Sequence, residues 1–140
     1  MKILSTLAVL GLLTFVAMPA MAVPTAPSGT LALQNTYDPE DVEKKFLKKA
    51  GKIYKRKCKK CHGSDGDGQG SAAADISDPK PTAFNIEGYM EGKKDGQLFW
   101  IIKEGSKDTE MNAFGPGSDV NLSEDEIWRV ITFMRATFTN

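Results

Sequence analysis

The sequence predicts an all-α domain with about three main helices joined by long loops. Apolar residues recur at helical spacing in three separate stretches, and no stretch shows the apolar–polar alternation of a half-buried strand. Between the first two stretches, residues 63–92 are rich in Gly, Asp, Ser and Pro. Loops this long in a small domain are usually functional or wrap around something. We therefore expect a core that side chains alone do not complete.

The first residues are predicted to be a secretory signal peptide. Lys2 precedes an apolar run over 3–16, and Ala20-Met21-Ala22 is a small-residue cleavage site. The run is short for a membrane helix, so we expect cleavage after Ala22, no stable span afterwards and a periplasmic location, with an uncleaved anchor as the alternative. Residues 23–37 carry no charge and are predicted to be a flexible leader. The expected organisation is thus 1–22 signal peptide, 23–37 leader and 38–140 folded domain.

The first helix of the domain is predicted to begin at Asp38 and to end near Gly63. Asp38 can cap it, and Pro39 suits the first helical position. One face is apolar and consists of Phe46, Ala50, Ile53, Tyr54 and Cys58.

Two further helices follow. The stretch 95–105 is expected to be capped by Asp95 and ended by Gly105. The last helix is expected to begin at Ser123, with Glu126 completing a capping box. Its apolar stripe contains Ile127, Val130, Ile131 and Met134.

Both cysteines and the single histidine lie within Cys58-Lys-Lys-Cys61-His62. The Cys-x-x-Cys-His pattern is typical of covalent haem attachment. The two thiols add to the haem vinyl groups, and the imidazole of His62 binds the iron on one side. We therefore expect one haem c, held by Cys58 and Cys61 with His62 as an iron ligand.

Other uses of these residues fit less well. A thioredoxin-like redox pair needs a βαβ context, and a zinc site needs a fourth ligand. A disulfide between the two cysteines leaves His62 without a role. The stretch SDGDGQG has alternating acids and glycines, but its spacing does not fit a calcium loop.

Five stretches carry a resemblance to a known family: GKIYKRKCKKCHGSDGDGQG, PKPTAF, DGQLFWIIKEG, MNAFGP and LSEDEIWRVITFMR. In this order they resemble a class I cytochrome c of the bacterial monohaem kind. The resemblance implies the class I fold, with helices and long loops wrapped around one haem. It also implies His and Met axial ligands and electron transfer.

The second axial ligand has three methionine candidates in the predicted mature chain. Met111 matches the family's ligand loop, which more often reads Met-Pro-Ala-Phe, whereas Asn112 stands here in place of the proline. Met90 lies in a loop and stays a candidate, as does an iron without a methionine ligand. Met134 is expected to be a core residue of the last helix.

The resemblance also implies residues around the haem. A backbone carbonyl near Pro79 or Pro81 is expected to accept a hydrogen bond from His62. Trp100, Tyr89 and Asn85 are candidates to contact the haem propionates, although Trp100 equally suits the core. Gly51 and Phe133 match the family's contact between the first and last helices.

The charge distribution suggests a redox protein as partner. Residues 44–60 contain ten Lys or Arg and no acid, whereas acids outnumber bases fourteen to seven from Cys61 onward. Positive charge near the haem would steer an acidic redox protein, although a solvated helix face or an anionic membrane surface would give the same pattern. Export and a haem argue against nucleic acid.

We interpret the chain as a soluble periplasmic electron-transfer protein. No acid–base or nucleophile constellation is visible, so we do not interpret it as an enzyme. The alternatives are a haem enzyme or sensor with a labile sixth ligand, and a fixed cytochrome subunit of a respiratory or dehydrogenase complex.

Overall fold

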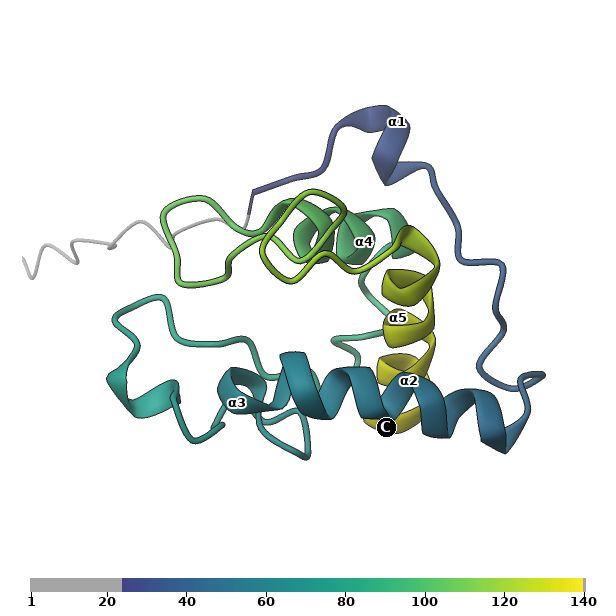
Figure 1. Cartoon of the computed structure of the whole chain (residues 1–140), viewed down its shortest axis with the longest axis horizontal. Coiled ribbons are helices and arrows are strands. Elements are labelled where there is room, and N and C mark those ends of the chain that lie inside the picture. Colours follow the sequence, from purple (N-terminus) through teal and green to yellow (C-terminus); the bar gives the residue numbers. More distant parts are fainter. Residues whose placement is uncertain (1–23, 140) are drawn as a thin grey trace, which may run out of the picture.

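The structure is a computed structural model that describes residues 24–139, and within this range it contains helices and no strand (Figure 1). The three longer helices are α2 (Lys44–Lys57), α4 (Asp95–Glu104) and α5 (Glu124–Phe138). Short helical turns are α1 (Ser28–Leu31), α3 (Lys59–His62) and the 3₁₀ turn η1 (Ala73–Asp75). The predicted all-α class with three main helices and long loops is confirmed.

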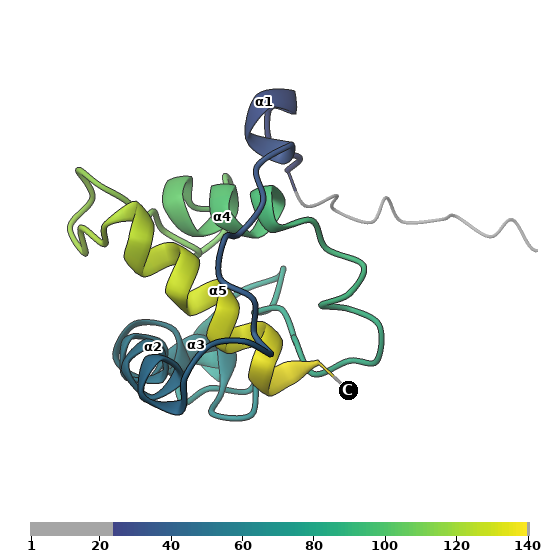
Figure 2. The same ribbon diagram turned by 90° about the vertical axis from the view of Figure 1, so that its right-hand side faces the viewer.

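Helices α2 and α5 cross each other and form the centre of the core (Figure 2). Gly51 lies at the crossing, where a Cβ would come within 2.8 Å of the Phe133 ring. The glycine therefore lets the aromatic ring approach the backbone of α2, as the sequence predicted. Ile53 and Tyr54 of α2 pack into the same cluster as the apolar stripe of α5.

The predicted start of the first helix was wrong, because α2 begins at Lys44 and not at Asp38. The Asp38 carboxylate accepts from the Glu40 N–H, and the Asp38 carbonyl accepts from Asp41 and Val42, which closes a separate turn. Glu43 is extended, with ψ of 149°, so the turn cannot continue into the helix. The predicted single helix is also divided, because α2 ends at Lys57 and Cys58 separates it from α3, whereas Gly63, with a φ of 79°, ends the helical stretch as predicted.

The other two helices match the prediction apart from one cap. Gly105, with a φ of 80°, ends α4, and Ser123 forms the predicted capping box with Glu126 at the start of α5. Asp95, however, does not cap α4. Its carboxylate instead accepts from Arg135 of α5 at 2.6 Å, and Lys94 occupies the cap position.

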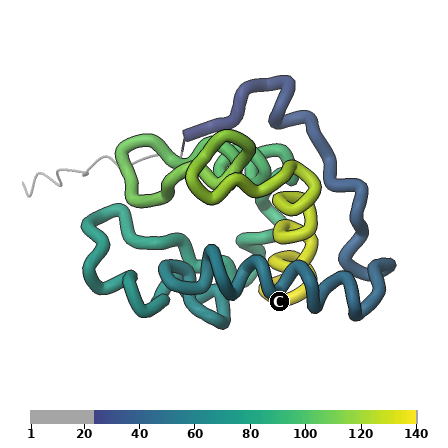
Figure 3. The backbone as a smooth tube through the Cα atoms, viewed as in Figure 1, coloured from purple at the N-terminus to yellow at the C-terminus, as the bar shows by residue number. Residues whose placement is uncertain are grey.

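Residues 24–37, which belong to the stretch that we predicted to be a flexible leader, pack along α4 and α5 on the way to α2 (Figure 3). The Gln97 side chain accepts from the Ala26 N–H and donates to the Pro24 carbonyl. Asn35 bonds to the Asp95 carboxylate, the Trp128 carbonyl and the Thr132 hydroxyl. Polar side chains of the later helices thus fasten this segment, which we call the N-terminal strap.

The predicted signal peptide, 1–22, lies outside the described residues. Within residues 24–139, no helix combines the length and the apolar character needed to cross a bilayer.

Candidate functional site

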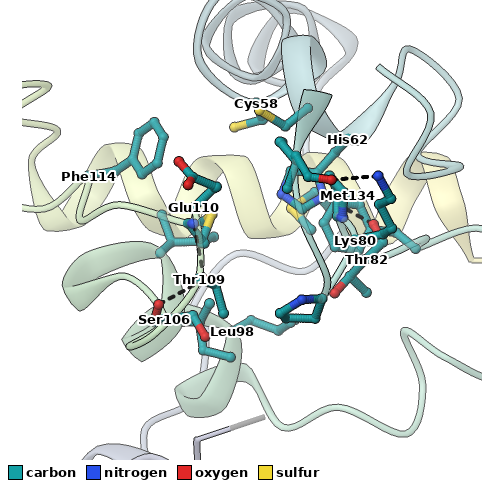
Figure 4. A pocket seen from close by; sticks show the side chains of 18 of the residues that line it. Cys58, His62, Lys80, Thr82, Leu98, Ser106, Thr109, Glu110, Phe114 and Met134 are labelled. Carbon is teal, nitrogen blue, oxygen red and sulfur yellow. Dashed lines mark hydrogen bonds between the residues drawn. The ribbon is translucent and has the colours of Figure 1, made fainter. Parts of the chain in front are cut away.

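Cys58, Cys61 and His62 line one cleft, which is walled mainly by apolar side chains (Figure 4). Leu98, Ile101 and Ile102 of α4 line it on the far side from the cysteines, together with Met111 and Phe114 of the connection to α5. The loop after α3 adds Pro79, Pro81 and Phe84. The cleft therefore collects the cysteine–histidine motif and residues from four later segments, the fourth being α5 with Met134.

The motif is held at the end of α2. The Cys58 N–H donates to the Tyr54 carbonyl, and the buried Tyr54 hydroxyl donates to the Gly63 carbonyl at 2.9 Å. Tyr54 thus braces both ends of the motif, a role that its place in the apolar stripe did not reveal.

Both thiols are free and partly buried beside the cleft. Burial, with a smaller contribution from the neighbouring Cys61, raises the pKa of the Cys58 thiol to about 12. The Cys58 sulfur is therefore a neutral thiol in an apolar setting.

His62 is fixed through one ring nitrogen. Its Nδ1 lies 3.0 Å from the Thr82 carbonyl oxygen, and its ring stacks on Phe84 with centroids 4.6 Å apart. Burial lowers the pKa of His62, while the bond to the Thr82 carbonyl opposes that shift. A neutral ring that donates from Nδ1 keeps Nε2 as the nitrogen that can bind a metal. The acceptor lies directly after Pro81, in the loop where the sequence placed it.

The three candidate methionines occupy different places. Met111 is half-buried and lines the cleft, in the connection that follows α4. Met134 also lines the cleft, from the apolar stripe of α5. Met90 is fully buried in the core and is not among the residues that line the cleft.

The candidates for contacts with the haem propionates also differ in whether they line the cleft. Tyr89 lines the cleft, whereas the structure places neither Trp100 nor Asn85 among the lining residues. Lys80 also lines the cleft, which the sequence did not predict. Its ammonium group donates to the backbone carbonyls of Ala73, Ala74 and Ile76.

The residues present fit a covalently attached haem. Two free thiols, an imidazole held through Nδ1 and a thioether line one apolar cleft, which is the donor set that a c-type haem requires. Within residues 24–139, no group of three or more His, Cys, Asp or Glu side chains forms an alternative metal site.

Comparison with known proteins agrees with this site. The sequence profile of the family described as cytochrome c matches residues 47–138, about two thirds of the chain. The chain belongs to the cytochrome c family. This cytochrome therefore carries covalently attached haem c, and Cys58 and Cys61 have the spacing of the attachment motif. No curated protein sequence matches it.

Solved structures share the fold. One belongs to the Kuenenia stuttgartiensis reducing HAO-like protein complex Kustc0457/Kustc0458, with 24% identity, a TM-score of 0.57, and coverage of 78% of this chain and 49% of that chain. Cytochrome cL of Methylophaga aminisulfidivorans has 22% identity and a TM-score of 0.53, with coverage of 75% and 61%. The KustC0563 c-type cytochrome has 22% identity and a TM-score of 0.51, with coverage of 65% and 98%. The alignments thus span only about half to three fifths of the first two chains.

Proposed function

We propose that this cytochrome is an exported, periplasmic carrier of one electron, with His62 and Met111 as the axial ligands of a single haem. The observation that carries the proposal is that these two side chains line one apolar cleft, although they come from segments far apart in the sequence. When bound, the haem supplies a one-electron iron couple.

The chain's own residues would set how that couple behaves. The sulfurs of Cys58 and Cys61 would hold the group covalently, and the Thr82 carbonyl keeps the His62 ring in one orientation. A Met111 thioether favours the reduced state and raises the reduction potential. The mainly apolar walls would limit contact of the bound group with water. With both His62 and Met111 bound, the iron would have no free position for a substrate, which supports a carrier over a catalyst.

A fixed subunit of a larger redox assembly is the second candidate. It is supported by the similarity to a chain from the Kuenenia stuttgartiensis complex, which is longer than this one. Size-exclusion chromatography of the protein from its native cells separates the two candidates, because a free carrier elutes near the mass of the single chain.

The basic residues of α2 and α3 are the proposed docking surface for an acidic redox partner. All ten side chains are exposed, and none takes part in the ion pairs found among the described residues. Lys57 also lines the cleft, so the basic surface reaches the site. Association rates should fall steeply with ionic strength if these charges steer the partner.

Visible spectra of the haem-loaded protein test the ligand assignment. Wild type should be low-spin and show the weak far-red band of methionine ligation when oxidised. Met111→Ala should lose that band, whereas Met90→Leu and Met134→Leu should keep it. A high-spin wild type, or a band lost in a different variant, would contradict the assignment and favour an open-iron enzyme or sensor.

A further inference from the structure

The loop that carries Met111 is closed at its base. The Ser106 N–H donates to the Met111 carbonyl at 2.8 Å, so the two ends of residues 106–111 meet. Gly105, just before the loop, has a φ of 80°, and a Cβ there would lie 2.6 Å from the Met111 carbonyl oxygen. The carbonyl of Met111 is therefore held between Ser106 and Gly105.

The Thr109 hydroxyl braces the same loop from inside. It donates to the Ser106 carbonyl at 2.8 Å and accepts from the Met111 N–H at 3.1 Å (Figure 4). The hydroxyl thereby links the first residue of the loop to its last. Both polar backbone atoms of Met111 are held by bonds within residues 106–111.

No proline ring restrains the chain after Met111, because residue 112 is Asn, and its side chain is exposed. The Asn112 N–H returns to the Glu110 carbonyl at 3.0 Å, which again depends on the turn. The conformation of Met111 thus rests on hydrogen bonds within residues 106–112, and the side chain that takes part in them is that of Thr109.

We propose that Thr109 is a positioning residue that keeps the Met111 thioether available to the iron and limits its exchange for other ligands. This inference rests on the proposed role of Met111. Preorganisation raises the effective concentration of a tethered ligand, so loss of the brace lowers the fraction of iron bound to methionine. Each hydrogen bond through the hydroxyl contributes a modest amount, and together they shift this fraction measurably.

The chain offers a matched control in Ser118. Its hydroxyl donates to the Gly115 carbonyl at 2.8 Å and accepts from the Asn121 N–H at 3.1 Å, which resembles Thr109 except that the N–H lies three residues later instead of two. Ser118 lies in the same connection but does not line the cleft. Thr109→Val removes the hydroxyl and keeps the branched shape, Thr109→Ser keeps the hydroxyl, and Ser118→Ala removes the equivalent brace away from Met111.

The experiment is an imidazole titration of the oxidised, haem-loaded protein, followed by loss of the far-red band. Thr109→Val should bind imidazole about tenfold more tightly than wild type, because methionine competes less well. Thr109→Ser and Ser118→Ala should stay within about twofold of wild type. The reduction potential should fall in Thr109→Val alone, since methionine ligation favours the reduced iron.

The outcomes separate this inference from the ligand assignment. If Met111→Ala keeps the far-red band, the assignment fails and the inference fails with it. If Met111→Ala loses the band while Thr109→Val and Thr109→Ser titrate alike, only the role of Thr109 is overturned. A Ser118→Ala variant as sensitive as Thr109→Val would also overturn it, because the effect would then be general loosening of the connection.

Discussion

The wall of the cleft that carries His62 is an extension of α2, whereas the wall that carries Met111 is a connection held by its own turns and by backbone bonds to α4. Tyr54, 1% exposed at the α2–α5 crossing, fixes the backbone around the cysteine–histidine motif. On the other wall, the Phe114 and Gly115 N–H groups donate to the Ile102 and Lys103 carbonyls of α4. Opening the first wall disrupts the core, while opening the second breaks local bonds.

This difference predicts that the two proposed axial ligands differ in how readily they leave the iron. Local opening costs less free energy than global unfolding when few buried contacts are lost. The His62 ring, tied to Thr82 and stacked on Phe84, should stay in place as long as the protein is folded. The Met111 side is where ligand exchange can occur without unfolding. Four predictions test this difference between the two walls.

The largest effect is expected at the helix crossing behind the His62 wall. Gly51→Val places branched carbons where a Cβ already comes within 2.8 Å of Phe133, whose ring is confined by Tyr54 and Phe138. We expect the free energy of unfolding to fall by about 2–3 kcal/mol, a value typical of overpacking. Denaturant unfolding of the haem-loaded protein measures it.

Gly29→Val is the control, because a Cβ at that helical glycine meets nothing within 4 Å. Its effect should stay below about 1 kcal/mol. Equal losses at both positions would mean that the crossing is not closely packed in solution.

The second prediction breaks the Met111 wall. Gly105→Ala forces a non-glycine residue to a φ of 80° and brings its Cβ to 2.6 Å from the Met111 carbonyl oxygen. The backbone strain alone costs about 1–2 kcal/mol. The far-red band should weaken, and hydrogen exchange should speed up over residues 106–115 more than in α2.

Gly117→Ala separates the effect of backbone strain from the effect of the steric contact with Met111. Gly117 has a φ of 87°, so it carries similar backbone strain, but its Cβ would contact nothing within 4 Å. This variant should lose stability and keep the band. A band that weakens equally in both would argue that strain anywhere in the connection releases Met111.

The sequence predicted the parts of this site that depend on short spacing. Cys58, Cys61 and His62 are adjacent along the chain, so their shared location follows from one helical turn. The predictions of helix ends with strong local signals were also correct. Gly105 ends α4, and the Ser123–Glu126 capping box begins α5. The Gly51–Phe133 contact was predicted through the family resemblance.

Long-range polar contacts were not predictable in this way. Asp95 looked like a helix cap, but its carboxylate bonds to Arg135, forty positions later. The strap looked flexible because it has no charge, yet amide side chains from α4 and its own Asn35 hold it. The brace at Thr109 is local, but a threonine two residues before a methionine has no distinctive pattern, so only the geometry reveals it.

The third prediction concerns the strap, which packs on the helices and not on either cleft wall. Asn35→Ala removes three side-chain bonds, to the Trp128 carbonyl, the Thr132 hydroxyl and the Tyr37 N–H, and leaves its backbone bond to Asp95. Thr132 still donates to the Trp128 carbonyl, so the two α5 groups stay paired with each other, whereas the half-buried Tyr37 N–H loses its acceptor. We expect a loss of about 1 kcal/mol, seen as a lower melting temperature, and no change in the far-red band.

The exposed neighbour Gln34 gives the control for the strap, and Gln34→Ala should be close to neutral. Faster proteolysis within residues 24–37 in Asn35→Ala would show that the strap detaches first. A weakened far-red band in Asn35→Ala would contradict the separation of strap and cleft.

The smallest effect is expected at Asp125, at the start of α5 and away from both walls. Hydrogen bonds from Arg129 and then Tyr37 lower the pKa of its carboxyl. A carboxylate with a lowered folded pKa contributes stability above its ordinary pKa, and this contribution is lost as the pH falls through the folded value. Because the group is largely exposed, the contribution is only a few tenths of a kcal/mol.

Melting temperatures at pH 7 and pH 3 should therefore differ slightly less in Asp125→Asn than in wild type, while the pH dependence of the far-red band stays the same. An Asp125→Asn variant that altered the band would instead connect this surface pair to the Met111 wall.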